Sequence, residues 1–136
     1  MAVIELAGVH QIDGVWPQVS DGFEKACRKT GGSLDAPYLW AETRAGRAFL
    51  IVVSEDSAVI AASVWRFENW ASGRKLNCLA LHGRAMTEWL QQHREFVTAM
   101  AKAGGATALV ADGRVGWART FPDAKLIRQT CEIQLS

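Results

Sequence analysis

Three strand-like segments in succession, with no helical segment between them, most constrain what this chain can fold into. Residues 47–53, 58–67 and 75–81 are rich in β-branched and other apolar residues, and the short polar stretches 54–57 and 68–74 separate them. Strands joined by short turns pair with their neighbours in antiparallel orientation. The sequence therefore predicts an antiparallel meander.

The pattern after the meander changes to a helical period. Apolar residues recur every three or four positions between residues 85 and 103, and Gly104 and Gly105 end the segment. This stripe consists of Met86, Trp89, Leu90, His93, Phe96, Val97 and Met100. We expect a long helix that buries the stripe, with Trp89 in the core.

Weaker signals lie on either side of these segments. Residues 2–6 predict a first strand, residues 16–28 have helical spacing with Pro17 in a tolerated first-turn position, and Asp35 is placed to cap a second helix ending near Gly46. Later segments predict a buried strand at 106–111, one or two helical turns at 115–121, and a half-buried closing strand at 126–135 with alternating polar and apolar residues.

Composition narrows the class of protein. The chain has 136 residues, 49% of them hydrophobic and 21% charged, and no repeat or linker, which predicts a single globular domain over residues 1–136. The net charge of +1, with no basic cluster, argues against nucleic acid as a partner. No apolar run approaches the ~20 residues of a membrane helix, and no signal peptide is evident, so we expect a soluble protein that contacts no membrane.

Cysteine and histidine spacing indicates neither disulfides nor a metal site. Cys27, Cys78 and Cys131 are odd in number, far apart and set among apolar neighbours, which favours reduced core thiols in a reducing cytoplasm. The histidines lack the spacing to Cys or carboxylate that zinc ligands need. We therefore expect no metal.

The order of the predicted elements is strand, two helices, three meandering strands, long helix, strand, short helix, strand. This order resembles the GNAT-like acyl-CoA N-acyltransferase fold, an α/β (α+β) class with a mixed, mainly antiparallel sheet and helices on both faces. The last stretch, GRVGWARTFPDAKLIRQTCEIQLS at 113–136, is also similar to the end of small phage and prophage GNAT-like proteins. A phage origin would place the protein in the host cytoplasm.

The resemblance implies a site for coenzyme A at the end of the fourth strand and the start of the long helix. Members of the family have Gln or Arg, two residues, Gly, one residue, and Gly or Ala there, because backbone N–H groups approach the pyrophosphate closely. The cofactor-binding positions that the resemblance implies are Leu81, Gly83, Arg84, Ala85 and, from the late loop, Arg114.

The same stretch departs from the family pattern. With Arg84 in the first position, Thr87 and Trp89 fall where small residues belong, and we expect the Trp89 side chain to block the phosphate cradle. Glu88 adds an unfavourable negative charge beside a diphosphate. The expectation is therefore no bound cofactor, or acetyl-CoA if the chain is active.

The catalytic groups that the family commonly uses are also not evident. The strand at 75–81 has no carboxylate, so the candidates for a catalytic base are Glu68 and His82. Glu68 lies in a predicted turn, where a charged residue is more simply explained by exposure to solvent. The only tyrosine, Tyr38, precedes the sheet. We expect a GNAT-like protein that has lost catalysis and acts through protein contacts. The alternative is an active N-acetyltransferase that transfers an acetyl group from acetyl-CoA to an amine, and a third reading is a protein that binds a small molecule in the cleft without chemistry.

One aromatic residue suggests where a partner would bind. Trp70 lies in the predicted turn 68–74, and an exposed indole in a turn often anchors a partner. The residue predicts a contact with an unknown protein or with a second copy of the chain. The alternative is that Trp70 packs over the edge of the sheet.

Overall fold

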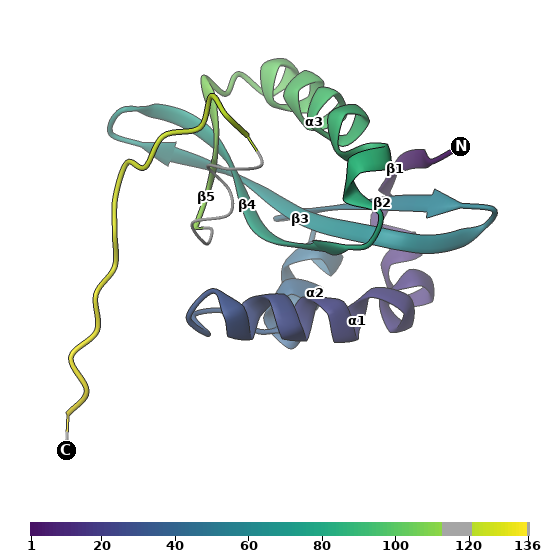
Figure 1. Ribbon diagram of the computed structural model, residues 1–136, viewed down its shortest axis with the longest axis horizontal. Coiled ribbons are helices and arrows are strands. Elements are labelled where there is room, and N and C mark those ends of the chain that lie inside the picture. Colours follow the sequence, from purple (N-terminus) through teal and green to yellow (C-terminus); the bar gives the residue numbers. More distant parts are fainter. Residues whose placement is uncertain (113–120, 136) are drawn as a thin grey trace.

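The computed structural model describes residues 1–112 and 121–135 (Figure 1). Its elements in chain order are β1 (Val3–Ala7), η1 (Val9–Gln11), α1 (Ile12–Lys29), α2 (Ala36–Arg44), β2 (Phe49–Glu55), β3 (Ala58–Trp70), β4 (Gly73–Gly83), α3 (Met86–Ala103) and β5 (Ala108–Ala111). The strands form one sheet in the order β1-β2-β3-β4-β5. The predicted α/β class with a mainly antiparallel sheet is confirmed.

Strand pairing follows the predicted meander. Neighbouring strands from β1 to β4 are antiparallel, whereas β5 runs parallel to its neighbour, β4. A parallel neighbour needs a crossover connection, and α3 provides it. In the β3–β4 register Val64 faces Ala80 and Trp65 faces Cys78, so Leu79 is an extra residue in β4, as in a β-bulge.

The helices cover the two faces of the sheet separately. Helices α1 and α2 lie on one face and α3 lies on the other (Figure 1). Because strand side chains alternate between faces, Val64 packs with Phe23 of α1 while its neighbour Trp65 packs with Val97 of α3. Two apolar layers therefore hold β3 and β4 from both sides.

The helix boundaries agree with the predicted caps in part. Asp35 caps α2 as expected, because its Oδ1 accepts a hydrogen bond from Tyr38 N at 2.9 Å. Helix α1 begins at Ile12, earlier than predicted, so Pro17 lies inside the helix and not in its first turn.

The β3–β4 hairpin is longer than the sequence predicted. Glu68, Asn69 and Trp70 pair with Lys75, Arg74 and Gly73, and the turn needs only Ala71 and Ser72 between them. Gly73 has φ 128°, a conformation open to glycine but strained for other residues. Glu68 and Trp70 are therefore strand residues, and their assignment to a solvated turn was wrong.

The closing strand predicted at 126–135 is absent. These residues run as unpaired chain, and their large apolar side chains are exposed: Leu126 by 75%, Ile127 by 54%, and Ile133 and Leu135 by 86% each. An alternating pattern makes a strand only where a sheet edge pairs with it, and this segment leaves the body of the domain (Figure 1). The short helix predicted at 115–121 falls almost wholly outside the described residues.

Candidate functional site

The two neighbouring strands β4 and β5 separate part-way along their length. They pair from Lys75 with Ala108 to Cys78 with Ala111, while β4 continues to Gly83 and remains paired with β3 on its other side. Within the described residues, positions 79–83 therefore present backbone N–H and C=O groups on the side toward β5 without a strand partner. Such an edge can hydrogen-bond the amide groups of an extended ligand.

The start of α3 lies directly after this open edge. Ala85 has a left-handed conformation with φ 55°, and the first helical hydrogen bond runs from Glu88 N to Ala85 O at 3.0 Å. The N–H groups before Glu88 have no partner within the helix, and a helix N-terminus favours anions. Arg84 and Ala85 are exposed, and Arg84 has no ion pair among residues 1–112 and 121–135.

Trp89 does not block this loop, contrary to the sequence expectation. Its side chain is fully buried against Val53 and Ala61, and the indole Nε1 donates a hydrogen bond to Arg84 O at 2.7 Å. Helical side chains lean toward the N-terminus, which brings the Trp89 ring beneath the loop and into the core. Trp89 therefore supports the loop from inside, and the prediction that it belongs to the core stripe is confirmed.

Gly83 is required by this packing. A Cβ added at Gly83 would lie 2.4 Å from the Cβ of Ala61 and 3.0 Å from Cζ2 of Trp89. Both distances are shorter than ordinary van der Waals contacts. The packing of the core explains the glycine without any need for a phosphate to approach it.

His82 lies under helix α1. Its ring packs edge-on against Phe23, with 4.6 Å between ring centroids, and directly against Gly22. Burial lowers the pKa of His82, although a hydrogen bond to the backbone of Val19 opposes the shift, so the ring is neutral at pH 7. Its Nε2 is buried and has no partner in the described part of the chain. The contacts of His82 are those of a packing residue.

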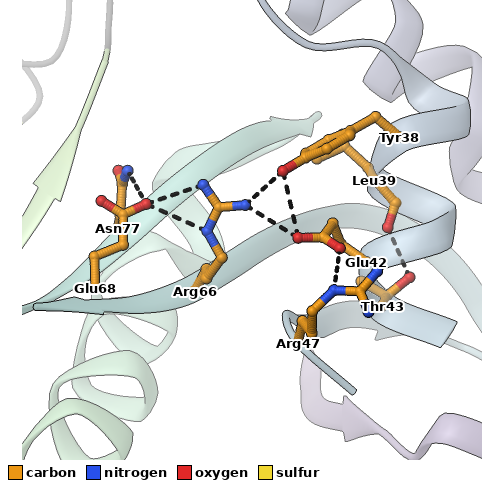
Figure 2. Close-up of polar contacts among 8 residues, drawn as sticks. All are labelled: Tyr38, Leu39, Glu42, Thr43, Arg47, Arg66, Glu68 and Asn77. Carbon is orange, nitrogen blue, oxygen red and sulfur yellow. Dashed lines mark hydrogen bonds and ion pairs between the residues drawn. The ribbon is translucent and has the colours of Figure 1, made fainter. Parts of the chain in front are cut away.

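Figure 2 shows a polar network on the sheet face that α1 and α2 cover. Arg66 is at its centre: Nη1 donates to Tyr38 Oη at 2.7 Å and to Glu42 Oε1 at 3.2 Å, and Nη2 donates to Glu68 Oε2 at 3.1 Å. Asn77 of β4 also donates to Glu68 Oε2, at 3.0 Å. The network joins helix α2 to strands β3 and β4.

Glu68 is a poor general base in this network. Burial alone would raise its pKa, but hydrogen bonds from Trp70, Asn77 and Arg66 together lower it. Trp70 Nε1 donates to Glu68 Oε1 at 2.9 Å, so both carboxylate oxygens have donors. The carboxylate is held in its ionised form and serves mainly to orient its neighbours.

The two predicted catalytic residues are not brought together. In the β3–β4 register His82 faces Ala62 and Glu68 lies six residues further along β3, a separation of roughly 20 Å at the rise of a strand. The predicted cofactor residues Leu81, Gly83, Arg84 and Ala85 do lie together at the end of β4, and Arg114 lies outside the described residues.

Sequence reasoning did not single out Arg66, Glu42 or Asn77 as members of a network. They come from three elements and are separated by up to 35 positions in the chain. No local pattern marks them, because only the packing of α2 on the sheet brings Glu42 to Arg66. Cys27 and Cys78 are buried as predicted, whereas Cys131 is exposed, so its prediction as a core thiol was wrong. Burial raises the pKa of the Cys78 thiol to about 12, which makes it unreactive at neutral pH.

The described residues contain no group of three or more His, Cys, Asp or Glu side chains able to hold a metal ion. No helix in the described part of the chain is both long and apolar enough to cross a membrane.

Comparison with solved structures identifies the fold. A ribosomal-protein-alanine N-acetyltransferase from Brucella melitensis aligns over 100% of this chain and 99% of its own, with a TM-score of 0.71 and 10% identity. The chain has the GNAT-like fold. A predicted acetyltransferase from Clostridium acetobutylicum, solved with acetyl-CoA, aligns over 100% of this chain and 96% of its own, with a TM-score of 0.68 and 10% identity.

The same fold occurs in proteins described by other functions. A transcriptional regulator from Bacillus halodurans aligns with this GNAT-like chain over 99% of its length and 100% of the regulator, with a TM-score of 0.67 and 12% identity. No protein-family profile matches the sequence, and no curated protein matches it. At these identities the likeness concerns the fold alone.

Proposed function

We propose that this GNAT-like protein is an N-acetyltransferase that uses acetyl-CoA. The observation that carries the proposal is the open edge of β4 at residues 79–83, which leads directly to an exposed helix start that Trp89 supports from beneath. The blocked cradle was the main sequence argument against a coenzyme site, and the buried position of Trp89 removes it.

The chain offers suitable groups for the two ends of the coenzyme. Backbone N–H and C=O groups of residues 79–83 fit the amides of a pantetheine arm, which is itself an extended chain. Arg84 and the N–H groups at the start of α3 fit the pyrophosphate. Glu88 is an opposing charge in the same turn, which lowers the expected affinity. Bound acetyl-CoA supplies the acetyl group as a thioester.

The acceptor in this proposal is an amine. Since Glu68 has donors on both oxygens and His82 lies under α1, neither is placed as a free base. The amine would therefore lose its proton to solvent, and the protein would contribute mainly by holding the two reactants together.

Both carboxylate oxygens of Glu68 accept hydrogen bonds from neighbouring side chains, so Glu68 is not free to act as a base. This observation favours a second candidate, a GNAT-like protein without catalysis that acts through protein contacts. In that case the β4 edge and the Trp70 region would serve a partner. A phage or prophage origin belongs to this candidate and stays a prediction.

Calorimetric titration with acetyl-CoA separates the two candidates. A dissociation constant in the low micromolar range, about −8 kcal/mol, supports the proposal, and no binding at millimolar ligand rejects it. An assay of free thiol release with a panel of small amines and peptide N-termini then tests transfer. Binding without transfer to any amine would favour the noncatalytic candidate.

A further inference from the structure

The described residues at the C-terminal end, 121–135, include an exposed segment. Its first part is held by ion pairs, and its last part has no strand partner among residues 1–112 and 121–135. We define residues 129–135 as the arm. Before the arm, Asp123 forms an ion pair with Arg94 of α3. Arg128 then lies 4.6 Å above the centre of the Trp70 ring and 3.2 Å from Asp112. Trp70 thus holds the root of the arm in place.

The arm itself has the composition of a strand with one apolar side. At every second position from 131 it carries an apolar residue: Cys131, Ile133 and Leu135. Ile133 and Leu135 are exposed by 86% each, and Cys131 is also exposed. Exposed apolar residues that alternate along an extended segment mark a strand without a partner.

The same chain carries an unpaired strand edge, as far as residues 1–112 and 121–135 show. β5 is the last strand of the sheet, and among these residues it pairs with β4 on one side only. Its four residues, Ala108–Ala111, are apolar, and Leu109 and Ala111 pack against the α3 side of the core. An apolar edge of this kind accepts an added strand through its backbone N–H and C=O groups.

We propose that the arm of one copy pairs with the outer edge of β5 in a second copy, and that two copies exchange arms reciprocally. The occupant is a second copy because one chain supplies both the unpaired strand and the unpaired edge, so a two-fold arrangement satisfies both at once. In the single chain the arm does not pair with its own β5, because beyond Arg128 the segment runs away from the sheet (Figure 1).

Light scattering after size exclusion tests the assembly in solution. The full chain should elute with about twice its 14.9 kDa mass at micromolar concentration. The double variant Ile133→Asp and Leu135→Asp should be a monomer, because it places two charges on the apolar side of the arm. Both residues are exposed in the single chain, so the variant should still fold, with an unchanged circular dichroism spectrum.

A matched control adds the same two charges to the other side of the arm. The variant Thr130→Asp and Gln134→Asp should remain a dimer. A wild-type chain that is monomeric at about 100 μM, or a dimer that the Ile133 and Leu135 substitutions leave intact, would overturn the proposal; the concentration lies well above the micromolar range expected of specific complexes.

Crosslinking tests the position of the arm. One copy carries Ala108→Cys with Cys131→Ser, and a co-expressed, size-tagged copy keeps Cys131 and the native Ala108; a short bis-maleimide reagent should join the two. The other two cysteines, Cys27 and Cys78, are buried. A further variant carries Ala108→Cys and keeps Cys131 in the same chain. If the reagent joins these two cysteines only within one chain, the arm pairs with its own β5, contrary to the proposal.

Discussion

Gly22 of α1 lies directly against the ring of His82 in β4: a Cβ added at Gly22 would be 2.2 Å from His82 Nδ1 and 2.5 Å from Cγ. The ring has little room to move, because Phe23 packs edge-on against it. The close approach of α1 to β4 therefore depends on a residue without a side chain.

Gly22→Ala should consequently destabilise the fold, by about 1–3 kcal/mol as overpacking does, even though alanine favours a helix. Gly14→Ala is the matched control, since a Cβ there meets nothing within 4 Å, and it should stabilise α1 by up to about 1 kcal/mol. Urea unfolding of both variants measures the difference. Equal effects of the two substitutions would show that α1 and β4 are not in close contact.

Trp89→Ala should cost roughly 3–5 kcal/mol of unfolding free energy, because the side chain is fully buried between α3 and the sheet. Trp89→Phe retains most of the apolar contact and loses the hydrogen bond to Arg84 O, so its cost should be smaller. Urea unfolding measures both costs. A loss below about 1 kcal/mol for the alanine variant would place the ring outside the core.

Arg66→Met should destabilise the protein by about 1–3 kcal/mol, because it leaves the largely buried carboxylates of Glu42 and Glu68 without a shared donor. The control is Arg47→Met. Arg47 also pairs with Glu42, but its side chain is 64% exposed, and surface ion pairs contribute about 0–1 kcal/mol. Thermal unfolding of the two variants at low and high salt compares their stabilities. A smaller loss of stability for Arg66→Met than for Arg47→Met would show that Arg66 is not the central residue of the network.

Protonation of His93 should lower the free energy of unfolding as the pH falls from about 6.5 to 4. Burial lowers the pKa of His93 to about 4 in the folded protein, so between these values the unfolded chain binds the extra proton and is favoured. The loss approaches about 3 kcal/mol at pH 4 and disappears above pH 7.

The comparison for this prediction is His93→Gln, which retains a polar partner for Ser63 Oγ, 2.8 Å from His93 Nε2 in the native protein. Urea unfolding at several pH values should show a weaker pH dependence for the variant. Other titrating groups contribute equally to both proteins. Parallel curves would mean that His93 is not buried in its neutral form.

Arg84→Ala should weaken acetyl-CoA binding about tenfold, equivalent to ~1.4 kcal/mol, without changing thermal stability. The reason is that Arg84 is exposed, free of ion pairs within the described residues, and next to the helix start. Arg28→Ala, on the exposed surface of α1, removes the same charge elsewhere and should leave affinity unchanged. Calorimetry that shows equal affinity for both variants would remove Arg84 from the proposed site.

The amino-acid pattern alone was enough to predict the meander, the long helix α3 and the core position of Trp89. These features follow from local rules: alternation in strands, a period of 3.6 in helices, and glycines that end them. The order of elements then sufficed to predict the GNAT-like fold, which the solved structures bear out.

How those elements meet could not be predicted in the same way. The direction of the Trp89 ring under the loop, the use of Glu68 by Arg66 and Asn77, and the packing of His82 under Gly22 all depend on contacts that the folded chain creates. The segment 126–135 has the pattern of a strand but no strand partner within the described residues of the single chain. The alternation of polar and apolar residues indicates which side chains favour burial. Strand pairing also requires an unpaired sheet edge close to the segment, and only the folded molecule determines where that edge lies.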